Sequence, residues 1–204
     1  MFVLFFFFNL WGVKLLISII VISLIGTLAH FLYDLSGHNK IVGLFASVNE
    51  STWEHIKIAL TPTFLWSLLD GYLYGGNPNY FFAKFICLLS IIIVIPLIFY
   101  SYRLFVKKSI ALFDISIFYV SIIISQVLFR YILGLSPLDY IHNYLGCIGV
   151  FILFGSYLLL TLLPLELFVF KDPNSNKYGF KGHRFYVKKI YKWKKCGIIA
   201  FNWR

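Results

Sequence analysis

Residues 17–31 read ISIIVISLIGTLAHF, and a stretch of this kind decides the fold because it suits lipid better than water. An α-helix needs about 20 mostly apolar residues to cross the hydrocarbon core of a bilayer. The chain offers five such stretches, so we predict transmembrane helices at 13–33, 55–75, 80–101, 110–133 and 146–168. The expected fold class is an all-α integral membrane bundle, formed by residues 1–170.

The composition agrees with this class. Hydrophobic residues make up 60% of the chain and charged residues 13%, against roughly 25% charged residues in soluble domains. The chain has three cysteines, Cys87, Cys147 and Cys196, which are far apart and form no CxxC pair. They predict neither a disulfide framework nor a zinc site. We expect residues 1–11 to lie along the membrane interface or to extend the first helix.

The charges divide the chain near Phe170. Residues 1–170 hold eight Lys/Arg and seven Asp/Glu, a balance of +1, whereas residues 171–204 hold ten Lys/Arg and one Asp, a balance of +9. Lys and Arg in short loops mark the cytoplasmic side of a membrane protein. The loop at 102–109 and the tail at 171–204 are both basic, so we predict that both are cytoplasmic. The expected location is the bacterial cytoplasmic membrane.

This orientation places the remaining connections. The 34–54 connection is expected on the cytoplasmic side, and the N-terminus and the loops near 76–79 and 134–145 on the outer side. No separate soluble domain and no internal repeat is visible in the sequence.

The most specific local pattern is HFLYDLSGHNKIVGLFASVNESTWEHIK, residues 30–57. Ser51-x-x-Glu54 and Ser47-x-x-Glu50 match the capping box that begins many helices. The apolar run at 41–45 is too short to span a membrane, so it is expected to be re-entrant or interfacial. We therefore expect the segment to be ordered and partly buried.

The same segment is rich in ionisable side chains, and helix capping explains only one of its glutamates. Ionisable groups at membrane depth usually face the protein interior or water and often mark function. The candidate polar or metal cluster comprises His30, Asp34, Glu50, Glu54, His55 and Asp114. Its residue types are compatible with a divalent cation, but its spacing follows no known ligand motif, and no cofactor is predicted. Capping and a functional site both stay open.

The letters HF-YD-SG-N-VGLF-VNES-WEH in this segment resemble an uncharacterised family of small bacterial multi-pass membrane proteins. The run DPNSNKYG, residues 172–179, is similar to that family's closing motif, which more often has Thr-Gly where Ser175 and Asn176 stand. The resemblance covers roughly residues 30–180. It implies a multi-pass membrane fold, and it implies no activity because the family has none assigned.

A second group of polar residues falls toward the opposite side. It contains Asp70, Gln126, Arg130, Asp139, His142 and Asn143. Arg130, near the end of a predicted span, has two interpretations: it reaches toward the interface along its aliphatic stem, or it forms an ion pair with Asp70. The second interpretation follows from the cost of burying a charge without a partner.

Residues 181–195, KGHRFYVKKIYKWKK, interleave basic and aromatic side chains without an acid. Such a segment suits anionic lipid surfaces and also single-stranded RNA, where aromatics stack on bases. A topology signal without a ligand is the third interpretation. The candidate residues for an anionic partner are Lys181, Arg184, Lys188, Lys189, Lys192, Trp193, Lys194 and Lys195, together with Arg103, Lys107 and Lys108.

Three classes of function were compared. An enzyme needs a defined catalytic constellation, and the chain contains no GxSxG, HExxH or glycine-rich phosphate loop. A transporter of this length would have to form a homodimer. The sequence therefore favours a membrane-anchored binding or scaffold protein, not an enzyme, whose basic aromatic surface binds RNA or anionic lipid. The alternative is an ion or metal transporter, or a metal-dependent membrane enzyme, that uses the cluster at 30–57.

Overall fold

The computed structural model describes residues 2–106 and 110–183, with side chains described from Gly12 onward, and within these ranges it is helical and has no β-strand. The long helices are α1 (Phe2–Leu35), α3 (Thr52–Tyr74), α4 (Tyr80–Arg103), α5 (Ala111–Leu133) and α6 (Tyr140–Leu162). Three short helices join them: α2 (Lys40–Phe45), and the 3-10 helices η1 (Phe168–Phe170) and η2 (Gly179–Gly182). The predicted fold class, a helical bundle, is confirmed.

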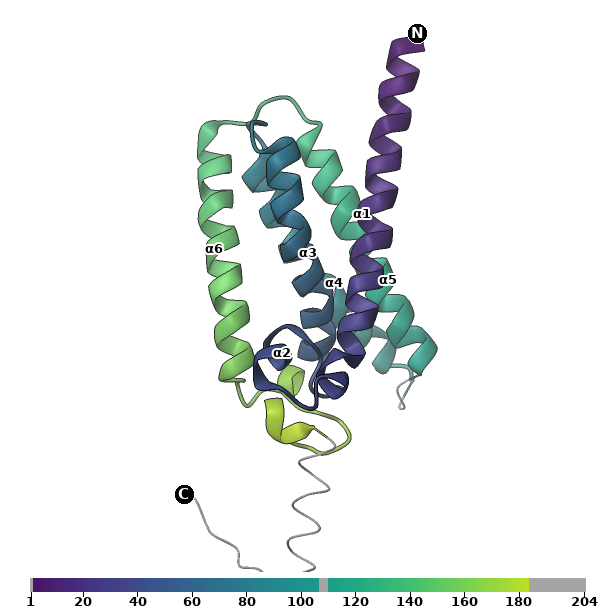
Figure 1. Cartoon of the computed structure of the whole chain (residues 1–204), viewed down its shortest axis with the longest axis vertical. Coiled ribbons are helices and arrows are strands. Elements are labelled where there is room, and N and C mark those ends of the chain that lie inside the picture. The colour runs from purple at the N-terminus through teal and green to yellow at the C-terminus, as the bar shows by residue number, and fades with distance from the viewer. Residues whose placement is uncertain (1, 107–109, 184–204) are drawn as a thin grey trace, which may run out of the picture.

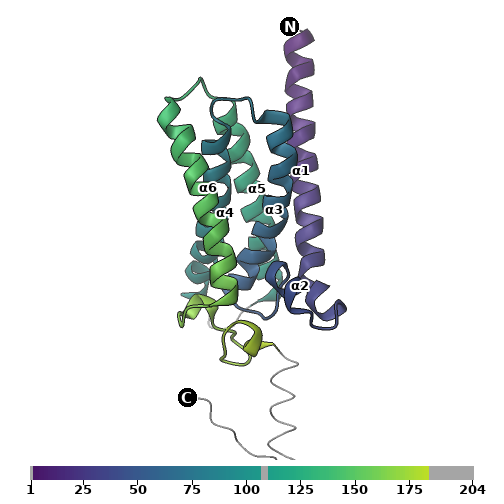
Figure 2. The ribbon, with the colours of Figure 1, turned by 60° about the vertical axis from the view of Figure 1, so that its left-hand side comes forward.

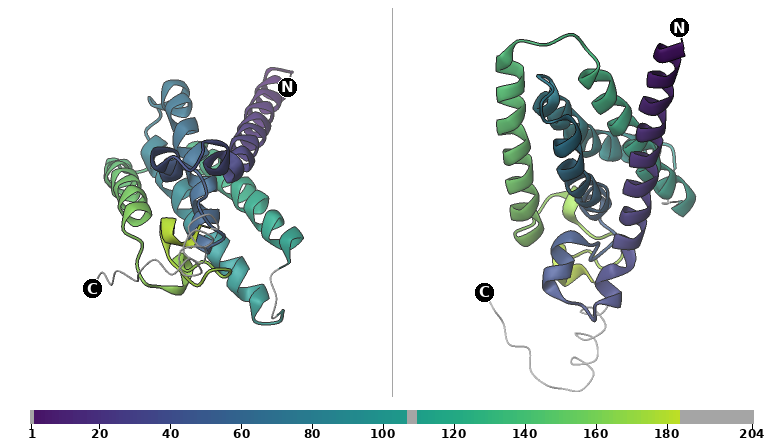
Figure 3. Two further views of the ribbon diagram at one scale, coloured as in Figure 1. Left: turned by 60° about the horizontal axis from the view of Figure 1, so that its bottom comes forward. Right: turned by 45° about the horizontal axis from the view of Figure 1, so that its top comes forward.

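The five long helices lie side by side and alternate in direction (Figures 1 and 2). One end of the bundle carries the connection 36–51, residues 104–106 and 110, and the segment 163–183, and we call it the loop end (Figures 1 and 3). The opposite end carries the connections 75–79 and 134–139, and we call it the turn end. The predicted grouping of the 34–54 connection, the 102–109 loop and the start of the tail at one end therefore matches the fold.

Within the described part of the chain, four helical stretches are long and apolar enough to cross a membrane, namely 12–35, 80–103, 111–133 and 140–162. Their outward side chains are apolar, as in Leu28, Leu97 and Phe151, so the chain is a multi-pass membrane protein with a bilayer as its environment. The predicted span 55–75 corresponds to α3, which lies among these helices and is less apolar. Its polar side chains Thr61, Thr63 and Asp70 are buried against neighbouring helices.

The last predicted span needs a correction. We expected 146–168, but α6 covers Tyr140–Leu162. Pro164 follows the end of the helix and disfavours its continuation, since proline lacks a backbone N–H and its ring crowds the preceding turn. At the other end Asn143 is accommodated because its Oδ1 accepts a hydrogen bond from the Phe81 N–H, at 2.7 Å, in the first turn of α4. Residues 2–11 extend α1, one of the two expected arrangements.

Close helix packing forms the core. The helix α4 contacts both α5 and α6, and α3 lies between α1 and α4. The main apolar cluster joins the helices at mid-bundle through residues such as Ile22, Leu60, Ile91 and Ile122, all essentially unexposed. At Gly146 a Cβ atom would lie 2.5 Å from the backbone of Phe82, so only glycine allows α6 to approach α4 so closely.

Candidate functional site

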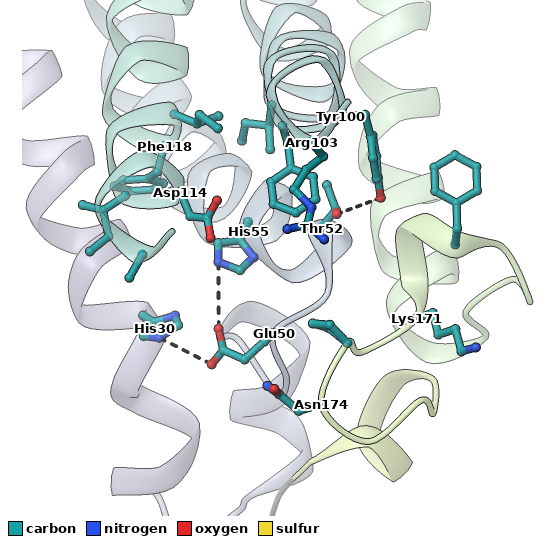
Figure 4. A pocket seen from close by; sticks show the side chains of 17 residues that line it. His30, Glu50, Thr52, His55, Tyr100, Arg103, Asp114, Phe118, Lys171 and Asn174 are labelled. Atoms are coloured by element: carbon teal, nitrogen blue, oxygen red, sulfur yellow. Dashed lines mark hydrogen bonds and ion pairs between the residues drawn. The ribbon is translucent and has the colours of Figure 1, made fainter. Parts of the chain in front are cut away.

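A cavity of about 570 Å³ lies at the loop end, and we call it the loop-end pocket. Its walls come from α1, the start of α3, the end of α4, the start of α5 and the segment after α6 (Figure 4). The lining residues with polar or charged side chains are His30, Glu50, Thr52, His55, Tyr100, Arg103, Asp114, Lys171 and Asn174. Five of these residues were predicted site residues: His30, Glu50, His55, Arg103 and Asp114.

Glu50 lies between two imidazoles in this pocket (Figure 4). Its Oε1 is 3.8 Å from Nε2 of His30, and its Oε2 is 4.0 Å from Nε2 of His55. Both separations exceed hydrogen-bond length, so these contacts are electrostatic and depend on protonation of the imidazoles. The Glu50 side chain is half exposed, at 50%. The arrangement keeps one negative charge and two titratable groups together.

Asp114 and Arg103 stand on neighbouring walls of the pocket. Asp114, in the first turn of α5, accepts a hydrogen bond from the Tyr102 hydroxyl. Arg103 is the last residue of α4, and its Nη1 is buried without a hydrogen-bond partner among the described residues. A buried guanidinium N–H that makes no hydrogen bond is costly. The arginine is therefore the group of this pocket that a ligand would satisfy.

The deeper wall of the pocket is apolar. It is formed by Ile95 and Phe99 from α4 and by Ile117 and Phe118 from α5. Next to it the hydroxyls of Thr52 and Tyr100 are 2.9 Å apart and share a hydrogen bond. The pocket therefore has an apolar face within two membrane-spanning helices and a polar face toward the loops.

The segment after α6 completes the pocket by folding back onto the 47–51 connection. Asp172 is buried, and its Oδ1 accepts a hydrogen bond from the Glu50 backbone N–H at 3.1 Å. Asn49 donates from its amide nitrogen to the carbonyl oxygen of Gly179 at 2.9 Å. These bonds hold the VNES motif at 48–51 against the DPNSNKYG motif at 172–179. The two stretches that carry the family resemblance thus contact each other.

Residues 30–57 are ordered and partly buried, as predicted. The two predicted capping boxes do not form. Ser51 is the N-cap residue of α3, but its hydroxyl makes no capping bond. The Ser51 N–H, which Glu54 would accept in a capping box, is donated to the Asn49 Oδ1. The Ser47 hydroxyl donates to the Asn49 carbonyl. Glu54 reaches back to the Val48 N–H at 2.9 Å and pairs with Lys57 at 2.6 Å.

The predicted polar cluster therefore separates into three places. His30, Glu50, His55 and Asp114 line the loop-end pocket. Glu54 is buried in an ion pair with Lys57, outside the pocket. Asp34 lies beside His38 and His183, at 3.1 Å and 3.0 Å from their Nε2 atoms. Among the described residues these three form the single group of His, Cys and acidic side chains whose geometry would suit one metal ion.

The predicted pair of Asp70 and Arg130 also needs a correction. Asp70 Oδ2 is 2.6 Å from the Nζ of Lys84, and both side chains are buried. Arg130 is buried too, but its guanidinium stacks over the Tyr74 ring at 4.6 Å. Lys84 projects from α4 toward α3 and lies closer to Asp70 in the packed bundle, a relationship that the sequence alone does not reveal.

Of the eight anion-binding residues predicted in the tail, Lys181 is the one that lies within the described residues. Lys181 is exposed at the loop end and does not line the pocket. The other members, namely Arg184, Lys188, Lys189, Lys192, Trp193, Lys194 and Lys195, lie outside the described residues, as do Lys107 and Lys108.

Sequence reasoning missed Lys57 and Lys84 as buried ion-pair partners, and it missed Lys171 and Asn174 as pocket residues. A signal was present for Lys84, because it interrupts the apolar run YFFAKFICLL at 80–89. A lone lysine in such a run requires an acidic partner on a neighbouring helix. The pocket positions of Lys171 and Asn174 depend on the return of the chain after α6, for which the sequence gives no local signal.

Comparison with known proteins gives one match. A family model described as "Family of unknown function (DUF6512)" matches residues 8–180. This range includes all five long helices, except the first residues of α1, and the closing motif. No curated protein and no solved structure matches the chain. The resemblance to an uncharacterised family is confirmed.

Proposed function

The chain belongs to the family of unknown function DUF6512, and from the geometry of its loop-end pocket we propose that it is a membrane-embedded binding protein for an anionic phospholipid headgroup. The observation that carries the proposal is the Arg103 guanidinium, which faces the pocket with a buried, unpartnered Nη1. Arginine binds phosphate through two parallel hydrogen bonds, which makes it well suited to this ligand class.

The charges around the pocket support an anion despite the two carboxylates. Glu50 is already placed between two imidazoles, and Asp114 already accepts the Tyr102 hydroxyl. Arg103 is without such a partner among the described residues, and Lys171 adds a second cation at the rim. A phosphate near Arg103 would supply the hydrogen-bond acceptor that its Nη1 lacks. Cationic side chains between membrane helices bind anionic headgroups by contacts of this kind.

The shape of the pocket supports an amphiphile. The apolar wall of Ile95, Phe99 and Phe118 belongs to helices that cross the membrane, and the polar rim belongs to the loops. A phospholipid places its acyl chains and its phosphate in that order along the membrane normal. An inorganic anion would leave the apolar wall without a partner.

The test is the lipid that remains bound to the full-length protein after purification in mild detergent, identified by native mass spectrometry. We expect wild type to retain an anionic phospholipid. Arg103→Gln should lower retention about 10- to 100-fold, since a hydrogen bond to a charged group contributes roughly 1.5–3 kcal/mol.

Lys181→Gln provides the matched control. It removes one positive charge at the same end of the bundle but outside the pocket, and it should leave lipid retention unchanged. Equal retention by the Arg103→Gln and Lys181→Gln proteins would refute the proposal. Bound material that disappears after ribonuclease treatment would identify RNA as the partner instead, and would move the function to the basic tail.

Cation handling by the same pocket is the second candidate function. It is favoured by the residue types, because a carboxylate and two imidazoles are donors that transition metals accept, although Glu50 lies 3.8 and 4.0 Å from the two Nε2 atoms, farther than ligand atoms on one ion. We expect metal analysis of wild type and Glu50→Gln protein to decide this point. Equal metal content in the two proteins would exclude Glu50 as a ligand.

A further inference from the structure

A second cluster of metal-ligating side chains lies outside the loop-end pocket. Asp34 is near the end of α1, His38 follows in the next turn, and His183 comes from the segment after α6. The ligand atoms of the three residues all lie within 4.8 Å of one another. The Oδ1 of Asp34 is 3.1 Å from Nε2 of His38 and 3.0 Å from Nε2 of His183. Ligand atoms of one tetrahedral zinc ion lie about 3.4 Å apart, so small shifts suffice.

The backbone around His38 holds its imidazole in place. Gly37 and His38 both have φ of +68°, the left-handed region. Glycine adopts this conformation readily, whereas a histidine there is uncommon. The His38 N–H donates to the Tyr33 carbonyl at 3.1 Å, which turns the chain back over the end of α1. A residue held in a strained conformation beside two other ligand-type side chains points to a role for that side chain.

His183 reaches the cluster because its segment packs on Tyr33 near the end of α1. The ring of the preceding Phe180 packs on Tyr33, with 5.9 Å between ring centroids, and the ring of His183 meets Tyr33 edge-on at 5.0 Å. Burial lowers the pKa of His183, since desolvation outweighs the attraction of Asp34.

We propose that Asp34, His38 and His183 bind one divalent transition-metal cation of the Zn²⁺ type, which fastens the segment 171–183 to the end of α1. Two imidazoles and a carboxylate are a donor set that zinc accepts. The Asp34 side chain is 70% exposed, so a water molecule would take the fourth position from the open side. Because the rest of the basic tail follows His183 directly in sequence, this ion would also fix the position of the residue to which that part of the tail is attached.

The first experiment titrates Zn²⁺ into the full-length protein, purified with an affinity tag that contains no histidine. We expect one equivalent to bind to wild type. His38→Asn and His183→Gln should each weaken binding at least about tenfold. Asparagine is chosen at position 38 because it tolerates the left-handed backbone, so the variant removes the ligand and preserves the turn.

His142→Asn is the matched control, since His142 is an exposed histidine at the turn end. It should bind Zn²⁺ as wild type does. Replacement of His55 by Asn separates this site from the loop-end pocket, because it would weaken Zn²⁺ binding only if the ion occupied that pocket. Equal affinity in wild type and His38→Asn would overturn the proposal, as would a loss confined to the His55→Asn protein.

The second experiment tests the fastening. Hydrogen exchange of residues 171–183 should slow when Zn²⁺ is added to wild type and should not change in the His38→Asn protein. The Co²⁺-loaded wild type should also show the visible absorption bands of a tetrahedral nitrogen and oxygen site. If Zn²⁺ does not change the hydrogen-exchange rates of residues 171–183 in wild type, the ion has no structural role there.

Discussion

Two buried ion pairs invite comparison, one near each end of the bundle. Glu54 and Lys57 meet at 2.6 Å near the loop end, and Asp70 and Lys84 meet at 2.6 Å nearer the turn end. All four side chains are at most 3% exposed. By distance and burial the two pairs are equal. They differ in connection, since Glu54 and Lys57 both belong to α3 whereas Asp70 and Lys84 join α3 to α4, and they differ in what surrounds them.

The pair of Glu54 and Lys57 is completed by the backbone. Glu54 accepts the Val48 N–H at 2.9 Å, and Lys57 donates to the Gly43 carbonyl at 2.9 Å. The pair therefore ties the 43–48 connection to the start of α3. It holds in place the segment that delivers Glu50 to the loop-end pocket, so its role is structural.

The surroundings of Asp70 and Lys84 are less complete. Asp70 Oδ1 is buried without a hydrogen-bond partner among the described residues, and Lys84 Nζ lies 3.8 Å from the centre of the Phe129 ring. Arg130 also lies over the Phe129 ring, and its Nε and Nη1 are buried without hydrogen-bond partners among the described residues. The negative charge of Asp70 and the positive charges of Lys84 and Arg130 leave this cluster with a net charge of +1. The difference teaches that satisfied hydrogen bonds, not burial alone, distinguish a fixed pair from one that can rearrange.

Lys57→Met should have the largest effect. It leaves the Glu54 carboxylate buried without its counter-charge, which costs about 3–5 kcal/mol. We expect a large drop in the thermal unfolding midpoint in detergent, together with faster hydrogen exchange in 43–48. A midpoint close to that of wild type would show that the pair does not hold this connection.

Lys84→Met should cost less, about 1–3 kcal/mol, because we expect Arg130, whose guanidinium lies over the same Phe129 ring as Lys84, to turn toward Asp70. The matched measurement is the same unfolding midpoint. The double variant Lys84→Met and Arg130→Met should then be destabilised more than the sum of the single variants. An additive result would mean that Arg130 does not substitute for Lys84.

Arg130→Met should change stability by less than about 1 kcal/mol or raise it, since it removes a buried charge whose N–H groups are incompletely paired. The methionine retains apolar contact with the Tyr74 ring. A loss as large as that of Lys57→Met would show that Arg130 is a required partner of Asp70.

Glu50→Gln should have the smallest effect on stability, within about 0.5 kcal/mol, because the side chain is half exposed and makes no short hydrogen bond. The matched variant is Glu54→Gln, the same isosteric change at the buried pair, and it should lower the unfolding midpoint far more. Similar unfolding midpoints for the two variants would contradict the division of the 30–57 cluster into a pocket part and a structural part.

The fold was largely predictable because hydropathy reports the spans directly. The sequence also indicated five of the pocket residues, since alternating helices bring His30, His55, Arg103 and Asp114 to one end. The predicted boundaries of the last span were wrong because a polar residue such as Asn143 can form its hydrogen bond with a neighbouring helix. A hydropathy average along the sequence does not detect such a bond.

Long-range partners could not be predicted. Asp34 meets His183 across 149 positions of sequence, and Asp172 meets Glu50 across 122. Both contacts arise because the segment after α6 folds back across the loop end, and no local pattern encodes that return. The pairing of Asp70 with Lys84 instead of Arg130 has a different cause, namely how α4 and α5 pack against α3, and no local pattern encodes that packing either.

The most direct test of the loop-end pocket measures retained anionic phospholipid in three full-length proteins by native mass spectrometry. They are wild type, Arg103→Gln, and a variant in which Lys188, Lys189, Lys192, Lys194 and Lys195 are all replaced by Gln. We predict that the tail variant retains the lipid as wild type does and that Arg103→Gln loses it. Retention by Arg103→Gln together with loss in the tail variant would contradict the account and assign the anionic partner to the tail.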